Sequence, residues 1–203
     1  MTRTRFSTLL IAPVAVASLS GCGINSIPTA EENAKARWAD VQAAYQRRAS
    51  LIPNLVATVK GAAGSEERIL TGVTEARAKA TSINITTDDL SNPQRLQEFA
   101  QSQNQLTQAL GQLRTVVEAY PDLKSQARFS DLMEEISGSE NRINIAIRDY
   151  NQAVQAYNTR IRTFPDVIGA KVFYGAEPMV PFQATTPGAE AAPEVKFDTN
   201  TSR

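Results

Sequence analysis

Residues 132–161 read LMEEISGSENRINIAIRDYNQAVQAYNTRI, and this stretch decides the architecture of the 203-residue chain. Apolar or small side chains recur there in alternating steps of four and three residues. The repeat consists of Leu132, Ile136, Ser139, Ile143, Ala146, Tyr150, Ala153, Tyr157 and Ile161. This heptad-like spacing predicts one face of a long helix that packs at a shallow angle against another helix. Ser139 is the weak point of the face, because it is the polar member of the repeat.

Three further helices are expected upstream, because apolar residues recur there at three- and four-residue steps. We expect them over about 30–61, 66–81 and 93–119, and we expect the long last helix to run from about Asp122 to Phe164. The first apolar stripe has one gap, at Arg48. Asn92 followed by Pro93 is typical of an N-cap with proline in the first helical position.

The predicted fold is therefore all-α, an antiparallel helical bundle of about four helices over residues 30–182. Its first helix is long and kinked, and its C-terminal helix is also long. Residues 166–183 mix apolar side chains with turn-forming residues, and we expect them to form an irregular flap over one end of the bundle. Residues 183–203 are rich in Ala, Thr, Pro and Glu, which predicts a disordered tail.

The kink is expected at Pro53, within RRASLIPNLVATVKG at 47–61. Proline has no N–H to donate to Ala49 and crowds that carbonyl, so a regular helix is bent there. A fresh helix start capped by Ser50 is the alternative, since proline is tolerated within a first turn.

Composition limits the possible chemistry. The chain has no histidine, which excludes Ser-His-Asp catalysis and the usual zinc sites. It has 21 basic and 21 acidic side chains, and this balance argues against a nucleic-acid-binding role. The single cysteine, Cys22, cannot form an intrachain disulfide. We expect no metal and no cofactor.

The N-terminal sequence has the features of a targeting signal. Residues 1–21 have two arginines, an apolar stretch and then Leu19-Ser20-Gly21 before Cys22, which resembles a bacterial lipobox. This predicts a signal peptide over 1–21, a diacylglyceryl group on Cys22 and a tether over 22–29. Acyl chains on this cysteine would hold the protein stably at a membrane. Gly23, rather than Asp, favours the outer membrane if the cell has two.

Several polar residues are candidate partner-binding groups. Arg47 and Arg48 suit anionic headgroups or a partner, although an ion pair at the surface or within the bundle explains them as well. The repeat Tyr150-Asn151 and Tyr157-Asn158 spans two helical turns, so both asparagines share one face. They suit hydrogen bonds to a neighbouring helix, and a ligand-binding ladder is the alternative.

Three segments together resemble the LemA family of bacterial envelope proteins. They are RRASLIPNLVATVKGAAGSEERILTGVTEARAKA (47–80), YPDLKSQARFSDLMEEISGSENRINIAIRDYNQAVQAYN (120–158) and FPDVIGAKVFY (164–174). The resemblance implies a bundle of long helices fixed to the membrane at its N-terminus, usually by a transmembrane helix, which a lipobox replaces here. It transfers no catalytic residue. Pro53 and Asn54 lie at the centre of its LIPNLV motif and become candidate partner-binding residues.

We therefore expect a non-enzymatic lipoprotein of the cell envelope that serves as a scaffold or adaptor for other envelope proteins. One alternative is an enzyme or transport component acting on a cell-wall or lipid substrate. That role needs convergent carboxylates in a cleft, such as Glu134 or Glu140 facing Asp149. A homo-oligomer that assembles through the long last helix is the other alternative.

Overall fold

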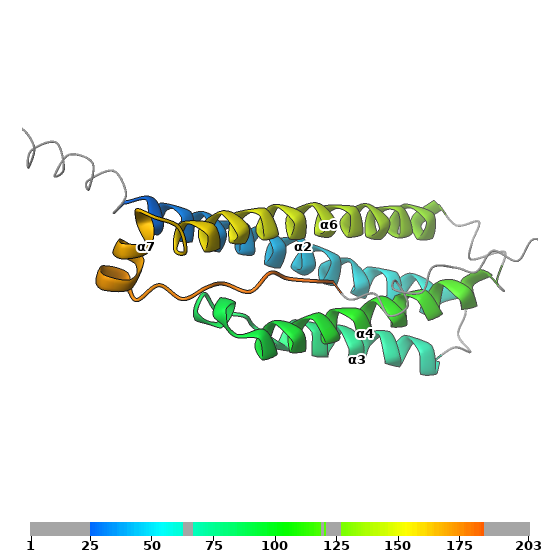
Figure 1. The fold of residues 1–203 in the computed structure, drawn as a ribbon. Helices are drawn as coiled ribbons and strands as arrows, with labels where there is room; N and C mark the ends of the chain where they lie inside the picture. The colour runs from blue at the N-terminus through cyan, green and yellow to red at the C-terminus, as the bar shows by residue number, and fades with distance from the viewer. Residues whose placement is uncertain (1–24, 63–66, 119, 121–126, 185–203) are drawn as a thin grey trace, which may run out of the picture.

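Two long helices, α2 (Ser26–Ala62) and α6 (Ala127–Arg160), lie side by side and form the longer half of the bundle (Figure 1). The shorter helices α3 (Glu67–Ser82) and α4 (Pro93–Glu118) form an antiparallel pair that packs against α2. The structure is a computed structural model, and it describes residues 25–62, 67–118, 120 and 127–184. Over these residues the fold is the all-α antiparallel bundle that the apolar stripes predict. No helix within the described ranges is long and apolar enough to cross a bilayer.

The heptad-like face of α6 is buried against α2. Eight of its nine residues are buried and Leu132 is partly buried. The predicted seam is thus confirmed, and it is occupied by contacts within the chain. The homo-oligomer alternative rested on this face, which the bundle has already covered.

The first helix starts earlier than the sequence indicated. Helix α2 begins at Ser26, so residues 26–29 are helical rather than part of a tether, and Ile27 is fully buried. Ile27 lies 3.5 Å from the place where a Cβ on Gly169 would be, so the start of α2 packs closely against the C-terminal region. The predicted signal peptide and Cys22 lie outside the described residues.

Helix α2 continues through Pro53 without a break. The Ser50 hydroxyl donates to the Arg47 carbonyl at 2.7 Å, so Ser50 does not cap a new helix, and the fresh-start alternative is wrong. The Ala49 carbonyl, which loses its usual partner to the proline, accepts a hydrogen bond from Arg77 Nε of α3 at 2.8 Å. A neighbouring helix therefore supplies the bond that proline removes.

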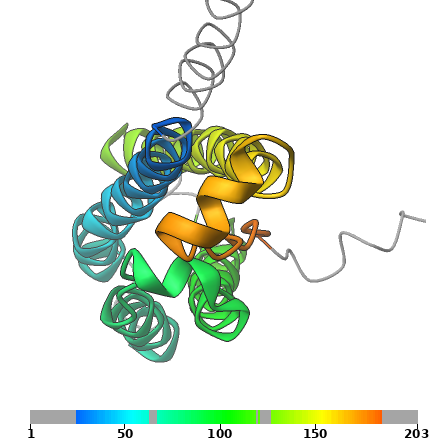
Figure 2. The same ribbon diagram turned by 60° about the vertical axis from the view of Figure 1, so that its left-hand side comes forward.

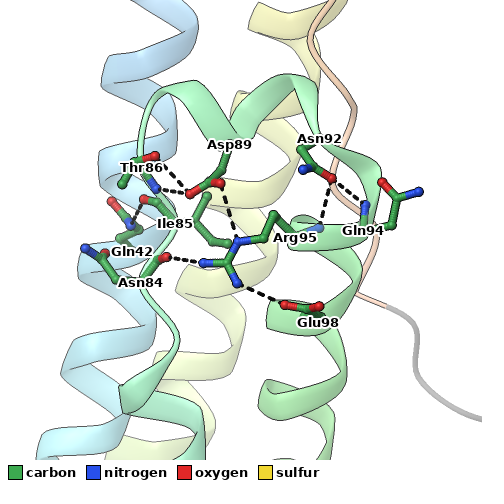
Figure 3. A network of polar contacts seen from close by, with 9 residues as sticks. All are labelled: Gln42, Asn84, Ile85, Thr86, Asp89, Asn92, Gln94, Arg95 and Glu98. Carbon is green, nitrogen blue, oxygen red and sulfur yellow. Dashed lines mark hydrogen bonds and ion pairs between the residues drawn. The ribbon is translucent and has the colours of Figure 1, made fainter.

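The connection between α3 and α4 is ordered by a polar network around Arg95 (Figure 3). Arg95 donates to the Asn84 carbonyl at 3.1 Å and contacts the carboxylates of Asp89 and Glu98. The predicted N-cap at Asn92 is confirmed, since its side-chain oxygen accepts from the backbone N–H groups of residues 94 and 95. This segment also contains the short helix η1 (Asp88–Ser91), which the sequence did not indicate.

The C-terminal region has two parts, where the sequence predicted a single flap. The short helices α7 (Asp166–Gly169) and η2 (Ala170–Tyr174) lie across the bundle end where α2 begins (Figure 2). Gly175, with φ of 55°, reverses the chain, and left-handed backbone of this kind favours glycine. Residues 176–184 then run extended along the bundle between α6 and α4 (Figure 1). We call residues 176–184 the C-terminal strap.

The core has two parts. The part near α7 is rich in aromatic rings: Trp38 lies 5.1 Å from Tyr150, 5.4 Å from Phe182 of the strap and 5.7 Å from Phe99, all in edge-to-face geometry. The other part consists mainly of aliphatic residues contributed by α2, α3, α4 and α6. The predicted disordered tail lies outside the described residues, apart from residues 183 and 184 at the end of the strap.

Candidate functional site

A layer of buried polar side chains separates the two parts of the core. It contains Arg48 of α2, Ser102 and Gln103 of α4, and Ser139 of α6, each 5% exposed or less. Arg48 occupies the gap in the first apolar stripe, and Ser139 is the weak point of the last. Both residues therefore lie at seam positions and point inward.

Arg48 connects three helices directly. Its guanidinium donates to Thr107 Oγ1 at 3.0 Å and to Gln103 Oε1 at 2.9 Å on α4, and it contacts Glu140 Oε1 on α6 at 3.3 Å. Gln103 in turn donates to the Ala80 carbonyl of α3 at 3.0 Å. All four long helices are thus joined at one level, which is the intrabundle role weighed for Arg48 from the sequence.

Burial shapes the electrostatics of this layer. Loss of solvent lowers the pKa of Arg48, while Tyr45 and Glu140 raise it in part. Burial also raises the pKa of Tyr45 to about 12, and the guanidinium carbon of Arg48 lies 5.2 Å from the Tyr45 ring centre. A pocket of about 240 Å³ opens onto the layer beside Arg48 and Glu140. Arg48 Nε is buried and has no hydrogen-bond acceptor among the described residues.

The asparagine repeat on α6 holds the C-terminal strap. Asn158 donates to the Met179 carbonyl at 2.7 Å and accepts from the Met179 N–H at 2.9 Å. Asn151 makes the same pair of bonds with Phe182, both at 2.8 Å. The sequence predicted that both asparagines face one way, and they do, but their partner is an extended segment and not a neighbouring helix.

The two tyrosines of the repeat complete this ladder. Tyr150 donates to the Val180 carbonyl at 3.0 Å, and Tyr157 donates to the Glu177 carbonyl at 3.1 Å. Burial raises the pKa of both phenols, which keeps them as hydrogen-bond donors. On its other side the strap is held by η1, because the Val180 N–H donates to the Leu90 carbonyl at 2.9 Å.

The remaining candidates lie together on the outer surface of α2 and α6. Pro53 and Asn54 are exposed, and Arg47 pairs with Glu135 of α6 at 3.1 Å. Asn54 and Glu135 line a groove of about 570 Å³ between the two helices, together with Ala57, Thr58, Arg128, Asp131 and Leu132. We call this the α2–α6 groove. It lies toward the bundle end opposite α7.

The carboxylates named for an enzymatic role do not converge. Glu134, Glu140 and Asp149 are all on α6. At 1.5 Å rise per residue, Glu134 and Asp149 are about 22 Å apart along the helix axis, and Glu140 and Asp149 about 14 Å. Glu140 is instead engaged with Arg48. Within the described ranges, no group of three potential metal ligands occurs.

Sequence reasoning missed Gln103, Thr107 and Arg77. A signal for Gln103 was available: it sits at a four-residue step after Phe99, at a position where the α4 stripe would otherwise be apolar. Arg77 carried no such signal, because its partner is a backbone carbonyl on another helix.

The family model of LemA matches residues 37–197, most of the chain. The chain belongs to the LemA family. It is similar to a protein named Protein LemA from Metamycoplasma hominis, at 30% identity over 124 residues, which cover 61% of this chain and 52% of that protein. It is also similar to Magnetosome protein MamQ 1 and MamQ 2 of Paramagnetospirillum magneticum, each at 26% identity over 157 residues, or 70% of this chain and 58% of theirs.

This LemA-family chain spans between half and three fifths of the length of these curated relatives. The matched region contains the polar layer, the strap and both parts of the core, apart from Ile27 and Ala34 of α2. The match therefore covers most of the described bundle, whereas residues 1–36, which include the first turns of α2, lie outside it.

Proposed function

We propose that this LemA-family protein is an envelope lipoprotein, anchored through Cys22, whose bundle is a non-enzymatic scaffold or adaptor for other envelope proteins. The observation that carries the proposal is the lipobox at 19–22, followed after only three residues by an elongated bundle.

The dimensions of the bundle suit a spacer. Helix α2 has 37 residues and is therefore about 55 Å long. Its start would be held at the membrane by Cys22, and its far end would carry the α2–α6 groove well above the headgroups. Arg47 and Asn54 at this groove are the residues that we assign to partner contact.

The anchor places the bundle outside the cytoplasm. Because Gly23 follows the lipidated cysteine, the outer membrane is the favoured location in a cell with two membranes, with the bundle in the periplasm. Attachment would be stable because each buried methylene of an acyl chain contributes about 0.8 kcal/mol, and lipoproteins of this type carry two or three chains.

The anchor is tested with Cys22→Ala. We expect the variant to lose metabolic acyl labelling and to leave the membrane fraction. Ser20→Thr, which leaves the cysteine in place and alters the lipobox only conservatively, is the matched control. Label and membrane association that persist in Cys22→Ala would contradict the lipobox assignment.

The adaptor role is tested by photo-crosslinking in cells from position 54. The control is position 155, an exposed residue of α6 near the other end of the bundle. We expect a discrete crosslinked protein at 54 that is absent at 155 and is lost in Arg47→Glu. Since Arg47 and Glu135 form an exposed pair, this reversal should change stability by less than about 1 kcal/mol. The same products at both positions would contradict a dedicated groove.

A further inference from the structure

The bundle end formed by α7 and η2 exposes an unusual amount of apolar surface. Five of the six large apolar side chains that are exposed in the described residues fall within residues 164–174, and the sixth is Ile145. The five are Phe164, Ile168, Val172, Phe173 and Tyr174, with exposed fractions of 80%, 55%, 69%, 67% and 41%. We call this group the apolar end.

This exposure is a property of the fold and not of a loosely attached segment. Ala170 and Gly169 are buried, and the Ser26 hydroxyl donates to the Asp166 carboxylate at 2.7 Å. Ile27 packs against Gly169 from the first turn of α2. The short helices are thus fixed to the start of α2 (Figure 2), while their large apolar side chains remain exposed. Exposed apolar patches of this kind mark interaction sites.

The position of the apolar end identifies its partner. Ser26 is four residues from Cys22, and four extended residues span at most about 14 Å. A lipid attached to Cys22 therefore holds the apolar end against the bilayer surface, with no room for a protein domain between them. This step rests on the proposed lipid anchor.

The charges around the apolar end suit a headgroup layer. Arg162 and Lys171 are exposed beside it, and no ion pair among the described residues involves either. Arg160 contacts Asp166 at 3.8 Å, and Glu177 lies just beyond at the start of the strap. Aromatic residues with neighbouring basic residues are typical of surfaces that lie in the membrane interface.

We propose that the apolar end is a membrane-docking surface: Phe164, Val172 and Phe173 insert into the outer acyl-chain boundary of the leaflet that holds the lipid on Cys22. Insertion beside the anchor gives the bundle a second attachment point. With the lipid on Cys22 as the single attachment the rod could lie at any angle, whereas two points fix its long axis relative to the bilayer. The α2–α6 groove is then held at a defined height.

The test uses lipidated full-length protein in vesicles of phosphatidylethanolamine and phosphatidylglycerol whose acyl chains are brominated. Because Cys22 is acylated in this protein and is its only native cysteine, Phe173→Cys adds one free thiol for an environment-sensitive fluorophore. Ile145→Cys, at an exposed apolar position on the side of α6, is the matched control. We expect bromine quenching at position 173 to be at least threefold stronger than at position 145.

Equal, weak quenching at the two positions in anchored protein overturns docking and leaves the anchor intact, because acyl labelling of Cys22 is measured separately. Sedimentation gives a further outcome, in which the protein quenches weakly and forms a dimer that the Phe173→Ser substitution dissociates. That result also overturns docking, because the apolar end then binds a second copy of the chain.

If Cys22 carries no acyl group, the labelled Cys22→Ser protein is added to the same vesicles. Quenching at position 173 that falls at least threefold in a Phe164→Ser/Val172→Ser variant then supports docking without the anchor. Absence of quenching overturns both proposals. The thermal melting curve of each variant, which should match that of the parent because these side chains are exposed, checks the fold.

Discussion

Pro53 is accommodated in α2 because Arg77 takes over the hydrogen bond that the proline removes. If this is correct, the effects of replacing the two residues on stability must depend on each other. The Ala49 carbonyl belongs to a residue that is only 3% exposed, so water does not readily replace a lost partner. Removing Arg77 alone should leave that carbonyl unsatisfied.

The expected magnitudes follow from the chemistry of the bond. A hydrogen bond from a charged donor to a buried acceptor contributes about 1.5–3 kcal/mol, so Arg77→Ala should lower the free energy of unfolding by about 2 kcal/mol. In a Pro53→Ala background, the N–H of residue 53 can donate to Ala49 along the helix. Loss of Arg77 should then cost only about 0.5 kcal/mol, which gives a coupling energy of about 1.5 kcal/mol.

Pro53→Ala alone should raise stability by less than the roughly 3 kcal/mol seen for proline in a regular helix, because Arg77 already offsets part of the penalty. The assay is urea unfolding followed by circular dichroism on Cys22→Ser protein for all four members of the cycle. Arg68→Ala, an exposed arginine on the same helix, is the control and should change stability by less than about 0.5 kcal/mol. If Arg77→Ala costs the same in both backgrounds, Arg77 does not compensate for the proline.

Other features of the structure make separate predictions. Arg48→Ala should lower the free energy of unfolding by about 3 kcal/mol in urea, because it leaves the buried polar groups that it contacts without partners, and Arg47→Ala is its exposed counterpart. Asn158→Ala removes two hydrogen bonds from the strap, so amide hydrogen exchange at Met179 should accelerate by at least tenfold, while a change confined to α6 would contradict the ladder. Tyr45 has a raised pKa, about 12 against an ordinary value of 10, so its contribution to stability is complete below pH 10 and is lost as the pH rises through 12. Comparing alkaline unfolding of Tyr45→Phe with that of the parent protein measures this loss, and identical pH dependence would refute it.

The helices could be predicted from sequence because their information is local. The seam from Ile136 to Ile161, the cap at Asn92 and the helix after Pro93 depend on spacing and on residue chemistry within a few positions. The start of α2 was missed because Pro28 resembles a tether residue, although proline in the first turn of a helix is tolerated.

The polar layer could be predicted only in part from the sequence. Arg48 and Ser139 were visible as irregularities in two apolar stripes, and Gln103 is a third at the same kind of position. No single stripe shows that these irregularities meet, because that depends on how three helices are aligned along the bundle. The partners of Asn151 and Asn158 were hidden for the same reason. An asparagine that bonds to a peptide backbone places no requirement on the side chains of that segment, so the sequence of the strap does not indicate these contacts.

The polar layer also affects how the bundle unfolds. Contacts between apolar side chains make unfolding cooperative, and a level of hydrogen-bonded polar groups interrupts them. The half near α7 has the interlocked rings and the strap, whereas the other half relies on smaller aliphatic contacts. We therefore expect the distant half to open at a lower free energy than the half near the chain's start. If force is applied at the bundle end opposite α7, that half should unfold first, while the half near α7 stays folded.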